Sequence, residues 1–279
     1  MHILLVGGTG LVGSAIHARL SAGGHECVLV SRHPDAALHA RHVTLDVART
    51  TDASKWKGIL AGVDAVINAA GALQGQDMQG VHVAGSAALY TACESAGLRR
   101  VILFSAMGID RDAPTDFSRT KREGEAALMA RDLDWVVLRP SVVVGRPAYG
   151  GSALLRGLAS LPVLPVMPDT AAIQPVYLDD VVETVLFFLQ PGAPSRIALD
   201  LAAVHGGSPS ATRCRCFAHG YAGGPPTACT CLVGRLRSLT GRGTWPRCWV
   251  GERPSVRLRR RKCGAARSAI PSPGVSLPA

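Results

Sequence analysis

A glycine-rich turn between an apolar run and a helical pattern constrains the fold of this chain more than any other feature. Residues 3–6 are apolar and mostly branched, which is typical of a short buried strand. Gly7, Gly10 and Gly13 follow directly, and residues 14–20 then take up helical spacing. In this order Gly7 allows a tight turn, Gly10 lets a pyrophosphate approach the backbone, and Gly13 lets the helix pack closely on the strand. Because the amides at a helix start attract anions, the motif predicts a dinucleotide-binding site.

Apolar runs alternate with helical patterns through residues 1–144. Strands are expected at 2–6, 27–30, 42–45, 64–67, 101–104 and 134–138, and helices near 12–22, 52–61, 79–97 and 117–131. Such alternation predicts right-handed βαβ units, and therefore an α/β fold with a doubly wound parallel sheet. We interpret residues 1–144 as one dinucleotide-binding domain of the Rossmann type.

Residues 145–204 follow a different pattern. Five prolines lie among Gly, Ala and Leu in residues 145–175, and a helical pattern follows near 179–189. We expect a small, incomplete C-terminal substrate lobe here, which includes that helix and a returning strand.

Four further segments carry a family resemblance. They are 65–71 (Ala-Val-Ile-Asn-Ala-Ala-Gly), 101–106 (Val-Ile-Leu-Phe-Ser-Ala), 138–145 (Leu-Arg-Pro-Ser-Val-Val-Val-Gly) and 174–181 (Gln-Pro-Val-Tyr-Leu-Asp-Asp-Val). Together with the Gly-x-x-Gly-x-x-Gly turn they resemble the extended and atypical branches of the short-chain dehydrogenase/reductase superfamily, over residues 1 to about 204. Within that superfamily the chain is most similar to the nucleotide-binding accessory subunit of respiratory complex I and to epimerase-like proteins. The resemblance implies a Rossmann fold, NAD or NADP as cofactor, and oxidoreductase chemistry.

The resemblance also implies which residues hold the cofactor. Asp46 matches the position whose carboxylate meets the adenine amino group, with Val47 packing nearby, and residues 69–71 lie over the adenosine side. The predicted cofactor-binding residues are Gly7, Thr9, Gly10, Leu11, Val12, Gly13, Ser31, Arg32, Asp46, Val47, Ala69, Ala70, Gly71, Ser105, Lys121 and Pro140.

The end of the second predicted strand bears on the choice between NAD and NADP. An acidic residue there normally binds the ribose 2′-hydroxyl of NAD, whereas an arginine accommodates the 2′-phosphate of NADP. The strand ends in Ser31 and Arg32, and Asp35 lies farther into the loop. Arg32 offers a bidentate donor to a phosphate and Ser31 adds a hydroxyl. NADP is therefore the predicted cofactor, and NAD is the alternative. The simpler interpretation of Arg32 is a solvated arginine in a loop, without a role in binding.

The catalytic pattern of the superfamily is incomplete in this chain. The superfamily pairs a tyrosine with a lysine one helical turn later, so that the ammonium lowers the phenol pKa and holds the nicotinamide ribose. The aligned stretch runs from Phe117 to Lys121, so the lysine is present and the phenol is missing. Ser105 and Lys121 are the predicted catalytic residues, although Lys121 also fits an ordinary surface lysine. Tyr149 and Tyr177 are two candidate substitutes for the missing phenol, but no motif supports either of them.

Three function classes stay open on these residues. The first is an atypical reductase that acts on an unidentified small carbonyl or quinone-related substrate. The second is a cofactor-bound redox sensor or assembly protein with little turnover. The third is a nucleoside-diphosphate-sugar epimerase, which normally keeps the tyrosine, so Phe117 argues against it and favours the second class.

The formal net charge of +10 over 279 residues comes from one segment. Residues 206–279 hold thirteen of the thirty Lys and Arg residues, six of the eight cysteines and one of the twenty acidic residues, so the rest of the chain carries a charge of −2. This segment is about a quarter Gly and Pro and lacks apolar periodicity. Its charge is therefore a poor guide to the partners of the remaining chain.

Three interpretations of residues 205–279 compete. The pairs Cys214-x-Cys216 and Cys229-x-Cys231 lack the usual spacing of a zinc site, and basic runs are common in solvated tails as well as in nucleic-acid-binding segments. Codons allowed for this segment give amphipathic, helix-compatible sequences when they are read in a shifted frame. We interpret the segment as a weakly ordered basic tail produced by a frameshift, and we expect neither a metal site nor a nucleic-acid partner.

The remaining sequence bears on cellular location. Outside the tail the chain carries only Cys27 and Cys93, which fits a reducing compartment. Its longest apolar runs fall short of the roughly 18–20 residues of a membrane span, and the first strand starts at residue 2, without a signal peptide before it. We expect a cytoplasmic protein that acts on a small molecule, and association with a membrane surface or a respiratory complex stays open.

Overall fold

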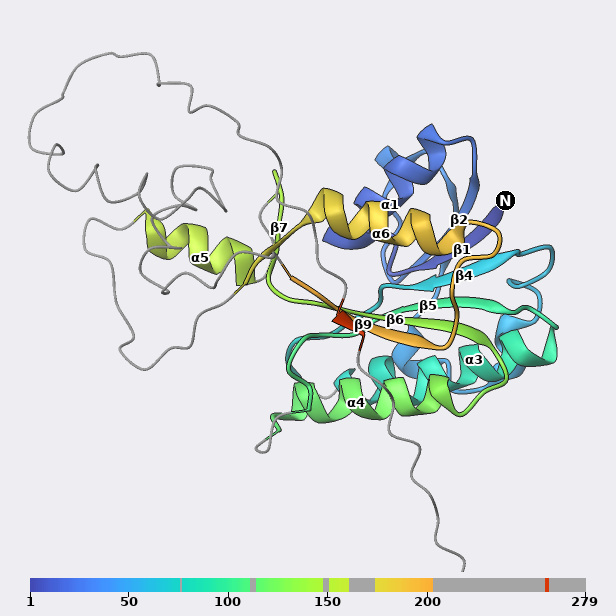
Figure 1. Ribbon diagram of the computed structural model, residues 1–279. Coiled ribbons are helices and arrows are strands. Elements are labelled where there is room, and N and C mark those ends of the chain that lie inside the picture. Colours follow the sequence, from blue (N-terminus) through green and yellow to red (C-terminus); the bar gives the residue numbers. More distant parts are fainter. Residues whose placement is uncertain (76, 111–113, 148–150, 161–173, 203–258, 261–279) are drawn as a thin grey trace, which may run out of the picture.

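Seven parallel strands form the centre of the molecule in the computed structural model, which describes residues 1–75, 77–110, 114–147, 151–160, 174–202 and 259–260 (Figure 1). The strands are β1 (His2–Val6), β2 (Glu26–Ser31), β3 (Arg41–Thr44), β4 (Ala65–Asn68), β5 (Arg100–Phe104), β6 (Asp134–Pro140) and β9 (Ile197–Leu201). Their spatial order is β9-β6-β5-β4-β1-β2-β3, so the chain order reverses at β1. The predicted doubly wound parallel sheet is confirmed, and all six strands expected within residues 1–144 form.

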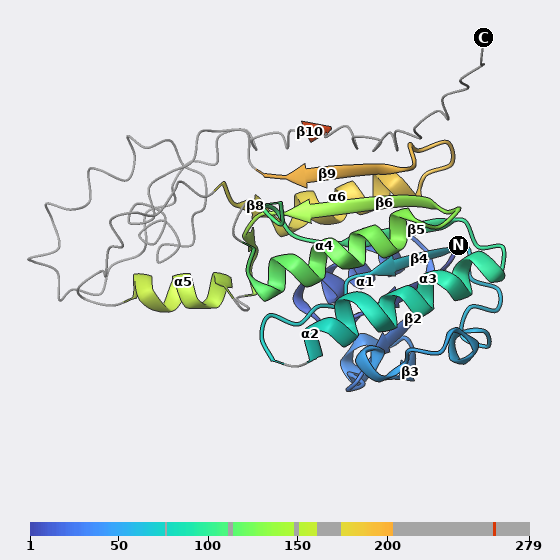
Figure 2. The same cartoon turned by 90° about the horizontal axis from the view of Figure 1, so that it is seen from below.

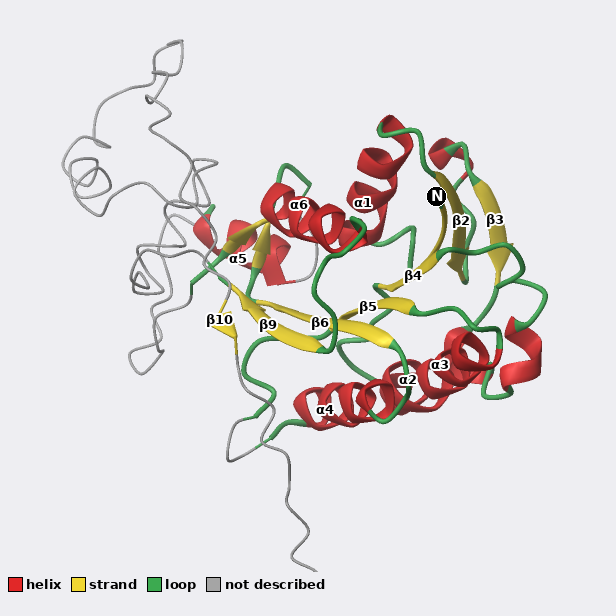
Figure 3. Cartoon of the chain, turned by 45° about the vertical axis from the view of Figure 1, so that its right-hand side comes forward, coloured by secondary structure: helices red, strands yellow, loops and turns green. Residues whose placement is uncertain are grey.

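Helices cover both faces of this sheet (Figures 1 and 3). On one face lie α1 (Leu11–Ala22) and α6 (Leu178–Leu189), and on the other lie α3 (Gly85–Ser95) and α4 (Asp116–Met129). Each face has its own buried apolar cluster, because alternate side chains of β1, β4, β5 and β6 point to opposite faces. No helix within the described ranges is long and apolar enough to cross a membrane.

Two expected helices differ from the prediction. Residues 52–61 contain only a short 3-10 helix (Ala53–Trp56). Asp52 caps its start by accepting the Ser54 amide, and Gly58 after its end disfavours a longer helix. The segment near 79–97 is interrupted: α2 (Asp77–Gln79) leads into a π-helical segment (Gly80–Ala84) before α3 begins. This π segment lies at the carboxyl end of the sheet and shapes the site described below.

The domain boundary expected at 144/145 is corrected by the structure. β9 extends the main sheet beside β6, and α6 packs against α1 within the same apolar cluster. Both elements therefore complete the Rossmann layers and do not form a separate lobe. What the structure describes of the smaller lobe is α5 (Gly151–Ala159) and a parallel pair of β7 (Val143–Val144) with β8 (Val176–Tyr177).

The last described segment is β10 (Arg259–Arg260), which pairs antiparallel with β9 at the sheet edge (Figure 2). The predictions for the rest of residues 205–279, including the four Cys-x-Cys cysteines, lie outside the described residues, as do those for residues 161–173 and for Tyr149. The frameshift interpretation therefore stays a prediction.

Candidate functional site

The glycine turn has the geometry that its sequence predicts. Gly7 has φ +78°, a left-handed conformation that favours glycine. A Cβ on Gly7 would lie 2.8 Å from the Ala70 nitrogen, and one on Gly13 would lie 2.2 Å from the Gly7 oxygen. A Cβ on Gly10 would meet a single atom within 4 Å, the Gly7 oxygen at 3.4 Å. Gly7 and Gly13 are thus required by close backbone packing, whereas Gly10 leaves space for a ligand.

Helix α1 starts at this turn and presents its amides there. Gly10 is the N-cap residue with extended backbone angles, and no side chain caps the helix. The first amides of an α-helix have no partner within the helix, so they are available to an anion. Thr9 lies half-buried in the turn, and Leu11 and Val12 begin the helix and pack against the apolar cluster. This arrangement fits the pyrophosphate of a dinucleotide.

The turn after β4 forms the neighbouring wall of the site. The buried Asn68 side chain accepts the Ala70 amide at 3.2 Å and donates to Ser86 Oγ at 2.9 Å and Tyr90 Oη at 3.1 Å. Its orientation is therefore determined by α3, and the backbone of residues 69–71 is held against Gly7. Ala69, Ala70 and Gly71 therefore line the turn after β4, and their predicted contact with the adenosine side of a cofactor stays a prediction.

The residues after β2 are partly engaged with one another. Ser31 Oγ donates to the His33 carbonyl at 2.6 Å, so the His42 Nε2 atom at 2.9 Å is the donor to this hydroxyl. Ser31 can therefore donate to a phosphate only if its loop contact opens. Arg32 is about 60% exposed and lies 3.6 Å from the Asp77 carboxylate. Asp35 caps a short 3-10 helix (Ala36–Leu38) by accepting the Ala37 amide at 3.0 Å, so its carboxylate is used within the loop.

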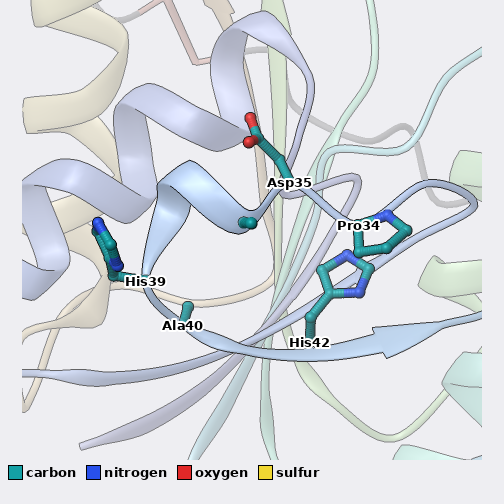
Figure 4. Close-up of a pocket in the computed structure, with 6 residues that line it drawn as sticks. Pro34, Asp35, His39, Ala40 and His42 are labelled. Atoms are coloured by element: carbon teal, nitrogen blue, oxygen red, sulfur yellow. The ribbon is translucent and has the colours of Figure 1, made fainter.

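A cavity of about 460 Å³ lies in the β2–β3 connection (Figure 4). Its lining residues are Pro34, Asp35, Ala36, His39, Ala40 and His42. It contains none of the predicted site residues and adjoins Ser31 through the ring of His42. Sequence reasoning did not predict this cavity.

Asp46 and Val47 follow β3 at the same end of the sheet. The Asp46 carboxylate accepts the Ala48 amide at 3.0 Å and lies 3.6 Å from Arg49 Nε. Val47 is buried in the core, where its carbonyl oxygen would lie 1.8 Å from a Cβ on Gly85. Their place beside β3 is compatible with an adenine contact, which stays a prediction.

Ser105 and Lys121 come together although they are separated in sequence. Lys121 Nζ donates at 2.9 Å to the carbonyl of Phe104, the residue directly before Ser105. Ser105 is 6% exposed, and its Oγ has no hydrogen-bond partner among the described residues. A buried hydroxyl without a partner fits a site that a ligand completes. Pro140, at the end of β6, accepts the Met107 amide at 3.1 Å and borders this region.

Lys121 is a buried lysine, which excludes the interpretation as an ordinary surface residue. It is 7% exposed, and burial lowers its pKa from 10.5 to about 8, although the nearby Glu125 carboxylate opposes this shift. Glu125 is itself buried and forms a two-point ion pair with Arg139, with 2.8 Å between Arg139 Nε and Glu125 Oε1. This pair was missed in the sequence because its members belong to a helix and a strand.

His82 in the π segment was also missed. Its Nε2 atom accepts the Ala72 amide at 3.0 Å, so the ring proton is on Nδ1, which donates to Thr120 Oγ1 at 2.9 Å. Burial, and secondarily the charge of Lys121, lowers the His82 pKa to about 3, so the ring is neutral. A Cβ on Gly71 would lie 3.5 Å from Lys121 Nζ and 3.8 Å from His82 Nε2, so both nitrogen atoms converge at the turn after β4.

Phe117 packs its ring edge-to-face on His82, with 5.7 Å between ring centroids. It lies one turn before Lys121 and supplies no proton donor. Tyr177 lies in β8 directly before α6 and is half-buried. Within the described ranges no group of three or more His, Cys, Asp or Glu side chains is arranged to hold a metal ion.

Comparison with known proteins agrees with this geometry. A family model described as NAD(P)H-binding matches residues 7–159, more than half of the chain. The chain belongs to the NAD(P)H-binding family. This match includes the glycine turn, the end of β2, Ser105 and Lys121.

Individual relatives and solved structures also resemble this chain. Ceramide reductase of Caulobacter vibrioides is 26% identical over 194 residues, which cover 67% of this chain and 60% of the reductase. Bordetella bronchiseptica WbmG in complex with NAD superposes with a TM-score of 0.65 at 22% identity, covering 81% and 82% of the two chains. A short-chain dehydrogenase/reductase superfamily protein from Agrobacterium tumefaciens with bound NAD gives a TM-score of 0.62 at 19% identity, covering 76% and 80%. At this identity the structures establish the shared fold.

Proposed function

We propose that this protein is an NADP-preferring oxidoreductase of the atypical short-chain dehydrogenase/reductase type. The observation that carries the proposal is the convergence of the glycine turn, Ser105 and Lys121 at the carboxyl end of one parallel sheet. Family membership and a ceramide reductase among the relatives support a reductase class. When bound, the nicotinamide would supply a hydride, and the protein must hold the substrate oxygen and provide a proton.

The preference for NADP is supported by the end of β2. Arg32 offers an exposed guanidinium there, and the carboxylate of Asp35, the acidic residue nearest to it in sequence, is engaged with the Ala37 amide. Losing a charge-assisted contact costs about 1.5–3 kcal/mol, or roughly 10- to 100-fold in affinity. Arg32→Ala should weaken NADPH binding by this factor and leave NADH binding nearly unchanged, as measured by calorimetric titration. Arg19→Ala on α1 is the matched control, and an unchanged NADPH/NADH ratio in Arg32→Ala would refute the preference.

We further propose that the substrate is quinone-like. Hydride addition to a simple ketone leaves an alkoxide, which needs a strong positioned acid, and Phe117 cannot provide one. Reduction of a quinone with two electrons leaves an aromatic oxyanion whose conjugate acid has a phenol-like pKa of about 10. This anion is a much weaker base than an alkoxide, so it forms with far less help from a positioned acid. Lys121, whose pKa is near 8, and the Ser105 hydroxyl are the groups in this region that can hold and protonate such an oxygen.

Two experiments test this assignment. The first identifies the nucleotide that is released from the purified protein, and the second measures NADPH oxidation in the presence of matched quinones and ketones. Quinones should be reduced at least tenfold faster than ketones, and Lys121→Met should lower that rate, since a positioned acid contributes about 10²–10⁴-fold. Ketone reduction at an equal or higher rate would contradict the quinone assignment.

A redox sensor or accessory protein is the second candidate, and the loss of the phenol at Phe117 favours it. In that case the protein binds NADPH tightly and oxidises it with no member of the panel. An epimerase is less well supported, because its chemistry normally uses the missing tyrosine.

A further inference from the structure

Arg32, which we propose binds the 2′-phosphate of NADPH, already forms an ion pair with a carboxylate. Arg32 Nη1 lies 3.6 Å from Asp77 Oδ2, and about 60% of each side chain is exposed. Arg32 follows β2, and Asp77 begins α2 in the connection that follows β4. No sequence motif singles out Asp77.

The position of this ion pair in the fold relates it to the predicted cofactor site. β2 and β4 are the two neighbours of β1, so a contact between their following loops crosses the carboxyl end of β1, where the glycine turn lies. Figure 2 shows α2 at the end of the sheet toward which β6 and β9 point. The crevice at the strand-order reversal is where dinucleotides bind in folds of this kind. The ion pair therefore spans the adenosine end of the predicted cofactor site.

We propose that Asp77 is a specificity-determining residue that competes with the cofactor 2′-phosphate for Arg32. This inference rests on the proposed function, in which Arg32 binds that phosphate. A carboxylate and a phosphate use the same N–H donors of a guanidinium, so the phosphate must displace Asp77. The displaced carboxylate then remains near the phosphate and repels it. NADH carries a neutral hydroxyl at this position, so neither the competition nor the repulsion weakens its binding. Asp77 therefore reduces the difference in affinity between NADPH and NADH.

The size of the effect follows from the exposure of the pair. Exposed ion pairs alter equilibria by a factor of about two to five. Asp77→Asn should therefore tighten NADPH binding by about two- to fivefold, with little change for NADH. Asp77→Lys replaces repulsion with attraction, and we expect about tenfold tighter NADPH binding. Both gains should shrink at high ionic strength, since the groups involved are exposed to solvent.

Titration of the full-length protein with NADPH and NADH, at low and high ionic strength, tests the inference. Glu183→Gln is the matched control, because Glu183 is an exposed acid of α6 paired with Arg19 and its loss changes the net charge equally. The control should leave both affinities unchanged. In an Arg32→Ala background, Asp77→Asn should increase NADPH affinity by a smaller factor, since Asp77 and the 2′-phosphate no longer compete for Arg32.

The possible failures are distinguishable. Unchanged or weaker NADPH binding in Asp77→Asn, with a clear loss in Arg32→Ala, would overturn the role of Asp77 alone. Weaker NADH binding in Asp77→Asn would identify Asp77 as a ligand of the ribose and would also overturn it. An unchanged cofactor ratio in Arg32→Ala would instead overturn the preference on which this inference rests.

Discussion

Replacing Gly10 and Gly13 separately by alanine should produce two different defects. At Gly13 the new Cβ would lie 2.2 Å from the Gly7 oxygen and 2.9 Å from the Gly8 Cα, so backbone must move. Overpacking of this kind costs about 1–3 kcal/mol in folding free energy. With roughly 2–4 °C per kcal/mol for a domain of this size, Gly13→Ala should lower Tm by about 2–12 °C.

At Gly10 the new methyl group would meet only the Gly7 oxygen, at an ordinary 3.4 Å, and the backbone angles there suit alanine. Gly10→Ala should therefore melt close to the wild type. If Gly10 faces the pyrophosphate, the methyl group must instead displace the ligand, which should weaken NADPH binding about 10- to 100-fold.

Thermal unfolding and calorimetric titration of the same preparations separate the two defects. Gly58→Ala is the control, because a Cβ there meets nothing within 4 Å. Wild-type NADPH affinity in Gly10→Ala would show that Gly10 does not face the ligand. An unchanged Tm in Gly13→Ala would refute the packing argument.

Three further predictions concern the site around Lys121. Phe117→Tyr should raise ketone reduction by up to about 10²–10⁴-fold, measured by NADPH oxidation, because it restores a phenol one turn before the lysine. The Lys121 pKa is near 8 in the folded protein and 10.5 in its reference state, so the folded protein binds fewer protons between these values and its stability should rise with pH in that window. Denaturant unfolding from pH 7 to 11 should show this rise in the difference between the unfolding free energies of the wild type and Lys121→Met, because the buried thiols of Cys27 and Cys93, whose raised pKa values act in the opposite direction, are common to both proteins. Glu125→Ala removes the carboxylate from half-buried Arg139 and should cost about 1.5–3 kcal/mol in the same unfolding assay, whereas a cost below 1 kcal/mol would contradict a stabilising role of this pair.

Most of the Rossmann core could be predicted because its signals are local. The glycine turn needs only strand, turn and helix residues that are adjacent in sequence, and the expected strands agree with the structure to within about two residues. The expected helix at 52–61 was wrong for a tertiary reason. Trp56 is completely buried in the apolar cluster, and the chain then turns away through Gly58 and Gly62, the latter at φ +75°.

The same distinction between local sequence signals and tertiary contacts applies to the site residues. Ser105 and Lys121 follow from motifs, but the hydrogen bond of Lys121 to the Phe104 carbonyl, beside Ser105, depends on the packing of α4 against the sheet. His82 has no signal in sequence, because its neutral state depends on burial and on the charge of Lys121, and its hydrogen-bond partners Ala72 and Thr120 belong to other elements. Its π segment packs so closely that a Cβ on Gly80 would lie 2.8 Å from Ala48 and one on Gly124 would lie 2.2 Å from the His82 oxygen.

The sequence by itself determined the dinucleotide turn, the parallel alternation and the absence of a tyrosine at Phe117, because each depends on residue type and short spacing. Only the tertiary structure decided that β9 extends the main sheet and α6 covers it, that Lys121 is buried and that Arg32 lies beside Asp77. These outcomes depend on contacts between residues far apart in the chain. Burial and ion pairing are properties of such contacts, so no local pattern encodes them.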